Sequence, residues 1–578
     1  MKPAVPPEGD LAPSLPRRLA CALALVTIFC AALYLMALDR MVYWNDEVMS
    51  SVWAAGYTRA DLVRDIFRGE VLTRDELLAF EKPRPGTGVT APVRILWERA
   101  AEHPPFYFLL LRVWMELVGD SITRTRLLSV LFGIALLPAV WWLARELFAS
   151  RLAAWGSTAS VAASPFFALY AREAREYSLW ALLTALGSAA LVRAVRLDTP
   201  PEARRGLSRW YSWSLYALLT TLSLYTFPFA LLVTASHGGY ILLAAGHRRR
   251  SLAAWAVAAG AASLLFSPWA LQLGMQSQRS SWVMRWTEDS KPFVRWLLDG
   301  LINASHTFSA LDDFAAFDEH SPSFLGSLPF ALAVALLTIV AAALALVSAY
   351  RRAPRGAWIL LVCLFGSVTL VLVSLDLVKG GMRAVSPRYH VPGYLAVCLM
   401  LGYGFAGASR LRTTPARSAS LTALGALLAC GVAAEVHYLR ATTAWTKVFS
   451  FELPAMAIHL NEDLRPIVLA SGRHPFADAN VFNLISLAHR VRPTVSFLPI
   501  TLGEDGHARA DAGQLRIPEG YSSVYVFAPE PWALKELGVR TGRAAVPVLG
   551  DRGIEAQARP ALPPPLGFAV FVPLYQLQ

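Results

Sequence analysis

The stretch LACALALVTIFCAALYLMALDRMVYWNDE, residues 19–47, places an apolar run of membrane length shortly before two adjacent carboxylates, Asp46 and Glu47. A helix needs about 20 apolar residues to cross a bilayer, and residues 19–38 meet that need. Ionisable groups beside a membrane span are costly to desolvate and usually serve a function. The stretch therefore predicts a membrane protein with a functional acidic pair after its first span.

The composition agrees with this class, because 55% of the 578 residues are apolar and only 16% are charged. A soluble protein carries about a quarter charged residues. Helical apolar runs recur along the chain, and together with the first they predict about eleven transmembrane helices. The further runs are 126–146, 152–168, 177–195, 211–227, 228–246, 252–273, 325–350, 357–378, 389–407 and 419–437.

The distribution of basic residues predicts the topology. Cytoplasmic loops are enriched in Lys and Arg, and the basic clusters of this chain alternate accordingly if residues 104–118 do not cross the membrane. That stretch carries Arg112 and Glu116, which favours an interfacial amphipathic helix. We therefore predict a multi-pass protein of the cytoplasmic (inner) membrane with a cytoplasmic N-terminus. Topology explains the net charge of +12, so no nucleic-acid partner is expected.

Residues 1–440 are predicted to form the membrane domain, with a first outer loop over residues 39–125. Residues 441–578 differ, because short apolar runs at 466–470, 494–498 and 523–527 alternate with helix-like stretches. Strands that alternate with helices indicate a small α/β domain, predicted to be an accessory domain on the extracytoplasmic (periplasmic) side of the membrane. The five cysteines lie inside apolar runs and predict no disulfide framework.

Several ordered motifs carry a resemblance to a known family. They are His103-Pro104-Pro105-Phe106-Tyr107, Gly119-Asp120-Ser121, Arg126-Leu127-Leu128-Ser129, and Ser164-Pro165 leading into the segment 170–177, YAREAREY. In this order and spacing the chain resembles the family 39-type membrane glycosyltransferases, which have the GT-C fold. Protein O-mannosyltransferases and the aminoarabinose transferases of lipid A are related to them.

The resemblance implies an inverting glycosyltransferase that uses a polyprenyl-phosphate sugar at the outer face of the cytoplasmic membrane. Displacing the lipid phosphate needs a base for the acceptor's proton and cations for the leaving phosphate. Asp46 matches the family's catalytic carboxylate, with Glu47 in support. The alternative interpretation of this pair is a solvated acidic loop or a helix-capping feature.

Six further residues are candidates for binding the donor phosphate or the substrate: His103, Glu173, Arg175, Tyr177, Arg388 and Tyr389. Arg grips phosphate through two parallel hydrogen bonds. His103 stands where aminoarabinose-transferring relatives carry Lys, and it could instead cap the interfacial helix. Glu173 and Arg175 could be salt-bridged neighbours at a helix end, and Arg388 and Tyr389 could be membrane-interface anchors.

No metal and no cofactor are predicted to be required beyond the lipid-linked sugar substrate. The partners are the bilayer, the donor and an acceptor glycan, lipid or protein. Whether a hexose or a pentose is transferred stays open. One alternative function is a glycolipid transporter or flippase, which usually shows inverted repeats and charges at the membrane midplane. Another is a catalytically inactive glycan-binding membrane protein.

Overall fold

The computed structural model describes residues 14–198, 206–244, 248–277, 292–310, 322–411, 413–447, 450–471, 477–500, 517–528, 544–549 and 574–578. The chain splits into two compact units, each built from segments that are distant in sequence. Unit 1 comprises Met1–Met36, Ala100–Tyr107 and Arg126–Arg440, and unit 2 comprises Ala37–Arg99, Phe108–Thr125 and Ala441–Gln578.

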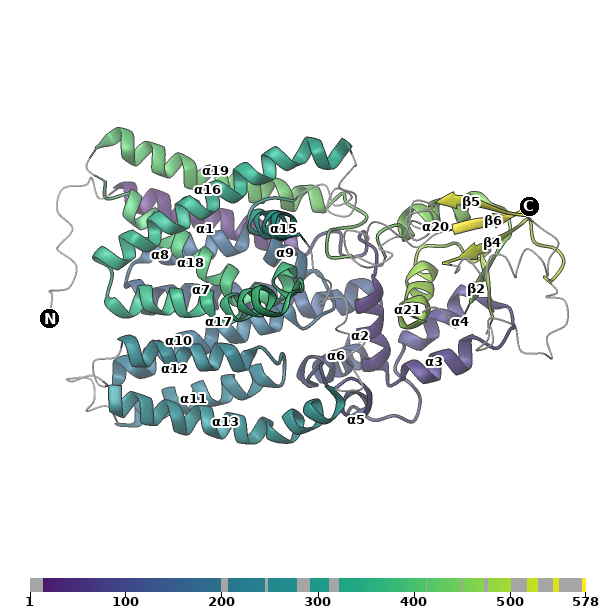
Figure 1. Cartoon of the computed structure of the whole chain (residues 1–578), viewed down its shortest axis with the longest axis horizontal. Helices are drawn as coiled ribbons and strands as arrows, with labels where there is room; N and C mark the ends of the chain where they lie inside the picture. Colours follow the sequence, from purple (N-terminus) through teal and green to yellow (C-terminus); the bar gives the residue numbers. More distant parts are fainter. Residues whose placement is uncertain are drawn as a thin grey trace. The chain divides into compact units, whose positions relative to one another are not determined.

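Unit 1 is helical, and each of the eleven predicted apolar runs contains a helix (Figure 1). Among the described residues, eight helices are long and apolar enough to cross a membrane, and the number rises to nine with the bent pair α8–α9. The number of crossings and their direction stay predictions. The helices that lie in the eleven apolar runs are α1 (Ser14–Tyr34), α7 (Ile122–Phe148), α8 (Arg151–Ala162), α9 (Pro165–Ala171), α10 (Tyr177–Leu197), α11 (Gly206–Leu224), α12 (Ala230–Ala244), α13 (Arg248–Ser277), α16 (Pro322–Arg352), α17 (Arg355–Lys379), α18 (Val391–Ala408) and α19 (Thr414–Tyr438). Unit 1 also contains α15 (Phe293–Ser305).

The run predicted as one span over 152–168 is broken. Helix α8 ends at Ala162, α9 begins at Pro165, and the two are bent by 60°. Proline cannot donate a backbone hydrogen bond and disfavours the helical conformation of the residue before it, here Ser164. The Tyr34 hydroxyl donates to the carbonyl of Ala162 at 3.0 Å. This bond partners a carbonyl that the break removes from the helix ladder, and the break directs the chain into the loop before α10.

Small residues allow α8 and α18 to pack closely. A Cβ added to Gly402 would lie 2.2 Å from the backbone nitrogen of Ser157, and one added to Gly156 would lie 2.9 Å from the carbonyl oxygen of Gly402. Such small-residue contacts let membrane helices approach backbone to backbone, where dispersion contacts stabilise them. The contact fixes α18, and therefore the short loop that precedes it, within unit 1.

Unit 2 joins the first loop to the C-terminal residues in one mixed sheet. The strand order is β1-β3-β2-β4-β6-β5, with β2 parallel to both β3 and β4 and the other pairs antiparallel. The strands are β1 (Leu72–Thr73), β2 (Pro466–Ser471), β3 (Ser496–Ile500), β4 (Ser523–Phe527), β5 (Ala545–Leu549) and β6 (Leu574–Leu577). The predicted strands at 466–470, 494–498 and 523–527 are confirmed to within two residues.

Short helices complete unit 2. The first loop contains α2 (Asn45–Ala55), α3 (Arg59–Ile66), α4 (Arg74–Leu78), the 3₁₀ turn η1 (Ala79–Glu81), α5 (Ala91–Arg99) and most of α6 (Phe106–Leu117). The C-terminal residues add α20 (Leu453–Glu462) and α21 (Ala477–Ala488). Residues 441–578 therefore share their sheet with the first loop, since β1 pairs with β3. Whether they have an accessory role stays a prediction.

The helix predicted at 104–118 is observed as α6, and its placement at the membrane interface stays a prediction. The environment of Arg112 differs from the expectation. At 12 residues and about 1.5 Å per residue, α6 is too short to span a bilayer. Arg112 is only 2% exposed and does not face solvent or lipid headgroups. Amphipathic patterning identified the helix, but it could not show that a backbone elsewhere in the fold would supply the arginine's acceptors.

Candidate active site

Helix α2 positions the predicted acidic pair at its first turn. Trp44 has extended dihedrals, and its backbone nitrogen donates to Oε2 of Glu47 at 3.4 Å, which satisfies a donor that precedes the helix. Carboxylates in a first turn are stabilised by the positive end of the helix dipole. The helix ends at Gly56, whose φ of 100° is left-handed and therefore favours glycine. The sequence around Asp46 and Glu47 thus specifies a capped helix of 11 residues.

The two carboxylates have different surroundings. Asp46 is half-buried, whereas Glu47 is 0% exposed. The Nζ of Lys447 lies 3.2 Å from Oε2 of Glu47, and Lys447 is itself 0% exposed and 5.4 Å from the Trp44 ring centroid. A buried carboxylate needs such a counter-charge, because desolvation is otherwise prohibitive. Asp46 is therefore the carboxylate of the pair that a reactant can approach.

Sequence reasoning missed Lys447. It follows the last predicted span by several residues, and no motif surrounds it. The segment around it is bound to α2 at a second point, because the backbone nitrogen of Asn45 donates to Oγ of Ser450 at 2.9 Å. The Ser450 hydroxyl in turn donates to Asn483 on α21 at 2.7 Å. A lysine that lies 400 residues from its partner has no local signal in the sequence.

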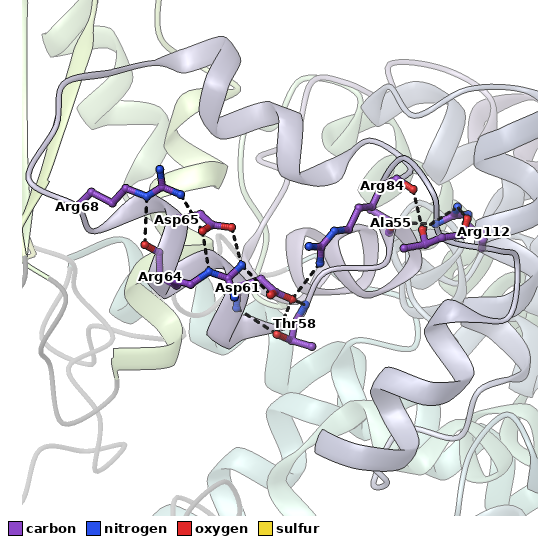
Figure 2. A network of polar contacts seen from close by, with 9 residues as sticks. Ala55, Thr58, Asp61, Arg64, Asp65, Arg68, Arg84 and Arg112 are labelled. Atoms are coloured by element: carbon purple, nitrogen blue, oxygen red, sulfur yellow. Dashed lines mark hydrogen bonds and ion pairs between the residues drawn. The ribbon is translucent and has the colours of Figure 1, made fainter.

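The opposite end of α2 is bound by Arg112. Its Nη1 donates to the carbonyls of Ala55 at 2.7 Å and Ala54 at 3.2 Å, and its Nη2 donates to the carbonyl of Thr87 at 2.8 Å. Figure 2 shows this guanidinium beside Ala55, where the backbone nitrogen of Arg84 also donates, at 2.8 Å. A cation at a helix C-terminus interacts favourably with the dipole. Buried cations therefore hold α2 at both ends.

The segment after α2 is ordered by a more exposed polar network (Figure 2). Thr58 caps α3 by accepting from the Asp61 backbone at 3.1 Å, and the Asp61 carboxylate accepts from the Thr58 hydroxyl at 2.7 Å. Arg64 donates to Asp61 at 2.9 Å and to Asp65 at 2.8 Å, although its side chain is 60% exposed. These contacts fix the start of α3 within unit 2.

In unit 1, a second acidic group lies at the start of α10. Oε1 of Glu176 accepts from Nη2 of Arg175 at 3.2 Å and lies 3.3 Å from Nδ1 of His103. Glu176 and Arg175 are each 1% exposed, and the His103 side chain is 19% exposed. Burial opposes ionisation of Glu176, but the Arg175 charge and the His103 contact outweigh it and lower the pKa of Glu176 to about 2.

These contacts bring the separate sequence motifs together. The hydroxyl of Tyr107, from the His-Pro-Pro motif, lies 2.9 Å from Oγ of Ser129 in the Arg-Leu-Leu-Ser motif. Ser129 Oγ donates to the backbone carbonyl of Arg175 at 3.4 Å. Just before His103, the indole of Trp269 donates to the carbonyl of Ala101 at 2.8 Å. The His-Pro-Pro motif, the Arg-Leu-Leu-Ser motif and the segment 170–177 are thus one structural cluster within unit 1, whereas Gly119-Asp120-Ser121 belongs to unit 2.

Aromatic rings connect the start of α10 with the loop before α18 within unit 1. The ring of Phe227 lies 5.7 Å from Tyr177 and 6.3 Å from Tyr389, measured between centroids. The Arg175 guanidinium lies 5.7 Å from the Tyr177 ring, and that of Arg388 lies 5.4 Å from the Tyr389 ring. Two predicted tyrosines, each with a predicted arginine beside it, therefore lie next to Phe227. Sequence reasoning missed Phe227 because a lone phenylalanine in an apolar run has no distinguishing pattern.

The loop that carries Arg388 is held by Asp376, near the end of α17. The Asp376 carboxylate accepts from the backbone nitrogen of Ala384 at 2.7 Å and from Nη1 of Arg383 at 3.2 Å. Two 3₁₀ turns, η5 (Arg383–Val385) and η6 (Pro387–His390), follow and lead into α18. Asp376 is 6% exposed, and these hydrogen bonds compensate its burial. The loop is therefore a fixed part of unit 1.

The remaining predicted residue, Glu173, is 0% exposed and lies in the turn between α9 and α10, where its carbonyl accepts from the Arg175 backbone at 2.7 Å. Glu176, which was outside the predicted set, is the acceptor shared by Arg175 and His103. Within the described ranges, no group of three or more His, Cys, Asp or Glu residues could hold a metal ion. That no metal is required stays a prediction.

Residues 102–271 match the family described as Dolichyl-phosphate-mannose-protein mannosyltransferase. No curated protein matches the chain. Among solved structures, ArnT from Cupriavidus metallidurans in the apo state is similar at 13% identity and a TM-score of 0.49, covering 97% of this chain and 98% of that one. The same protein bound to undecaprenyl phosphate is similar at 12% identity and a TM-score of 0.46, and the match covers 98% of each chain.

The archaeal oligosaccharyltransferase AglB from Archaeoglobus fulgidus, in complex with an inhibitory peptide and a dolichol-phosphate, is similar at 11% identity. Its TM-score is 0.47, and the match covers 84% of this chain and 64% of that one. The family match spans the His-Pro-Pro motif, Ser129, the segment 170–177 and Phe227, which the structure brings together. Residues 102–271 are therefore similar to the dolichyl-phosphate-mannose-protein mannosyltransferase family, within a chain whose described residues include several helices long and apolar enough to cross a membrane.

Proposed function

We propose that the protein transfers a sugar, with inversion, from a polyprenyl-phosphate donor to an acceptor at the outer face of the cytoplasmic membrane. The observation that carries this proposal is the asymmetry of the acidic pair. Glu47 is fully buried and ion-paired, whereas Asp46 is half-buried at the start of a helix held at both ends. One accessible, rigidly held carboxylate is what a general base requires.

The reaction balances as a single displacement. The acceptor hydroxyl gives its proton to Asp46 while its oxygen forms a bond to the anomeric carbon of the donor sugar. The bond from that carbon to the phosphate oxygen breaks, and its electron pair leaves with the polyprenyl phosphate. Attack from the side opposite the leaving group inverts the anomeric centre. A positioned base contributes about 10²–10⁴-fold to such a step.

The leaving phosphate accumulates negative charge and needs fixed cations. We assign this task to Arg388, with His103 as a further donor, and we assign Arg175 to positioning, because it is 1% exposed and paired with Glu176, which also contacts His103. Arg175 is held by Glu176, and Arg388 lies over Tyr389 in a loop bound by Asp376. Tyr389 offers an aromatic face of the kind that packs against sugars or isoprenoid chains, and Tyr177, which is 3% exposed, supports it through Phe227. Glu173 is assigned to shaping the turn that presents Arg175.

The family match supports a lipid-linked donor, since its description names a dolichyl-phosphate sugar. The positive-inside pattern supports an outer location for these loops. A glycolipid flippase and an inactive glycan-binding protein are the competing functions. Both would move or bind a lipid-linked sugar without forming a glycosidic bond, which gives the experiment its decisive measurement.

The test compares wild type with Asp46→Asn in proteoliposomes. Each is incubated with radiolabelled polyprenyl-phosphate hexoses and pentoses and a panel of lipid, glycan and peptide acceptors. Asp46→Asn is expected to lower turnover about 10²–10⁴-fold. Asp39→Asn is the matched control, because Asp39 lies in the same loop but is exposed, and it should retain activity. Equal transfer by Asp46→Asn, or donor translocation without a glycosidic product, would contradict the proposal.

A further inference from the structure

The loop that carries Arg388 is anchored on both sides of that residue. Before it, the backbone carbonyl of Val385 accepts from Nδ2 of Asn303 on α15 at 2.6 Å. After it, Nδ1 of His390 lies 3.0 Å from Oγ1 of Thr369 on α17. Arg388 lies between these two anchors, in the 3₁₀ turn η6, and its side chain is half-buried. Its guanidinium is therefore presented from a backbone that is held at two points.

The same loop is also closed on itself. Nε2 of His390 lies 2.9 Å from the carbonyl oxygen of Ala384, and the backbone nitrogen of Tyr389 donates to the carbonyl of Ser386 at 3.2 Å. A carbonyl only accepts, so Nε2 carries a proton, and the Nδ1 of a neutral imidazole accepts from the hydroxyl of Thr369. The turn is thus cross-linked internally, and its place within unit 1 is set by the contacts that reach it from neighbouring helices.

Helix α15 supplies these contacts together with α17. The backbone carbonyl of Asn303 accepts from the hydroxyl of Tyr394 on α18 at 2.6 Å. Nε1 of Trp296 donates to Oδ2 of Asp376, the carboxylate on α17 that also holds the loop, at 3.4 Å. On another side of α15, Ile302 packs against α16. The helix is therefore fixed to three neighbours, and Asn303 joins it to the loop.

We propose that Asn303 is a positioning residue of the donor site: through its bond to Val385 it sets the point at which the Arg388 guanidinium meets the phosphate of the lipid-linked sugar. The inference rests on the proposed function, in which Arg388 holds that phosphate. It gives α15, which no sequence motif marks, a part in donor recognition. Asn303 is not a catalytic residue in this proposal, because its amide and its carbonyl both bind the protein itself.

The physical basis is the geometry of phosphate binding by arginine. Two parallel hydrogen bonds from one guanidinium require the side chain to start from the right place, and such bonds weaken steeply when they lengthen or bend. Asn303→Leu keeps nearly the same side-chain volume and removes both polar atoms of the amide. The loop then loses its anchor at Val385, while α15 keeps the apolar contact of Ile302 with α16.

The experiment measures binding by the full-length protein in detergent micelles. The two probes are a polyprenyl monophosphate and the polyprenol of the same length, and the ratio of their affinities isolates the contribution of the phosphate. Arg388→Met should lower this ratio about 10–100-fold. Asn303→Leu should lower it about 5–10-fold. The double variant should fall no lower than Arg388→Met alone, because Asn303 acts only through that arginine.

A purely structural asparagine would weaken the binding of both lipids equally and leave the ratio unchanged, and that result would overturn the inference. A double variant whose ratio falls about 5–10-fold below that of Arg388→Met would also overturn it, since the two residues would then act independently. Val294→Ala is the control, because Val294 lies on the same helix with 77% of its surface exposed, and it should keep the wild-type ratio.

A second variant decides the matter if Asn303→Leu does not fold. Tyr394→Phe removes only the hydroxyl that donates to the Asn303 carbonyl, and it keeps the ring that stacks on Phe166 at 3.8 Å between centroids. We expect the affinity ratio to fall about 3-fold, because Asn303 loses one of its two contacts. An unchanged ratio in a folded Tyr394→Phe protein refutes the proposal.

Sugar transfer assayed on the same preparations separates this inference from the function on which it rests. A wild type that prefers the phosphate and forms no glycosidic bond would remove the transfer function and leave the role of Asn303 in phosphate binding supported. An unchanged ratio in Arg388→Met would remove the assignment of Arg388 and the inference with it. A fall in Arg388→Met without a fall in Asn303→Leu would remove only the role of Asn303.

Discussion

Two buried carboxylates, one in each unit, have cations at the same distance but at very different separations in sequence. In unit 2, Glu47 pairs with Lys447, 400 residues away, at 3.2 Å. In unit 1, Glu176 pairs with the adjacent Arg175, also at 3.2 Å, and with His103, 73 residues away. The first pair adjoins Asp46 in sequence, and the second contains Arg175 and contacts His103, all of which the proposed function uses. The comparison separates what a local sequence pattern can specify from what requires the assembled fold.

The difference follows from the cost of burial. A buried carboxylate is tolerated only with a counter-charge and hydrogen bonds, whatever the origin of the partner. In the segment 170–177 the counter-charge is part of the same motif, so the motif itself predicts a polar cluster. At Glu47 the motif supplies the anion alone, and the cation comes from residues after the last membrane helix. The burial of Glu47 on α2 therefore depends on Lys447, which the acidic motif does not predict.

Breaking the local pair should have the largest effect on stability. Arg175→Met leaves Glu176 buried without its principal counter-charge, and we expect a loss of about 3–5 kcal/mol in the free energy of unfolding. The double variant Arg175→Met with Glu176→Gln should recover most of this loss. Denaturation in mixed micelles measures both. Arg196→Met, near the far end of α10 and with a 50%-exposed side chain, is the control, and a loss equal to that of Arg175→Met would contradict the argument.

Acid pH should weaken the same pair more gradually. The pKa of Glu176 in the folded protein is about 2, below its ordinary value of 4.5. Its contribution to the free energy of unfolding is therefore fully present above pH 4.5 and is lost as the pH falls toward 2. The difference corresponds to up to about 3 kcal/mol. Unfolding measured from pH 6 to pH 2.5 should show a shallower decline for Glu176→Gln than for wild type. Identical slopes would mean that the Glu176 contacts do not control its ionisation.

An exposed pair of the same chemistry should matter least. Arg64 binds Asp61 and Asp65 at distances close to those of the buried pairs, yet its side chain is 60% exposed (Figure 2). Water and salt screen such contacts, so Arg64→Ala should leave the unfolding midpoint and the turnover unchanged within error. A clear loss of stability would show that burial is not what distinguishes the three clusters.

Much of the architecture could be predicted because it depends on periodicity and length. Each apolar run contains a helix, α6 is a short helix, and β2, β3 and β4 occupy the predicted strand positions. The interruption of 152–168 at Pro165 was missed, although Ser164-Pro165 was part of a recognised motif. Composition indicated that the run was apolar, but a break is set by backbone hydrogen bonding, and here Tyr34 on another helix partners the carbonyl of Ala162.

By itself the sequence determined the membrane class, the helices, the small C-terminal sheet domain and the acidic pair at 46–47, because these are properties of neighbouring residues and their spacing. Only the tertiary structure decided which carboxylates are enclosed and which cations meet them: Lys447 at Glu47, Arg112 at the end of α2, and Phe227 between Tyr177 and Tyr389. The physical reason is that ionisation and burial depend on distance in space. The chain brings those partners together only when segments far apart in sequence pack into one unit.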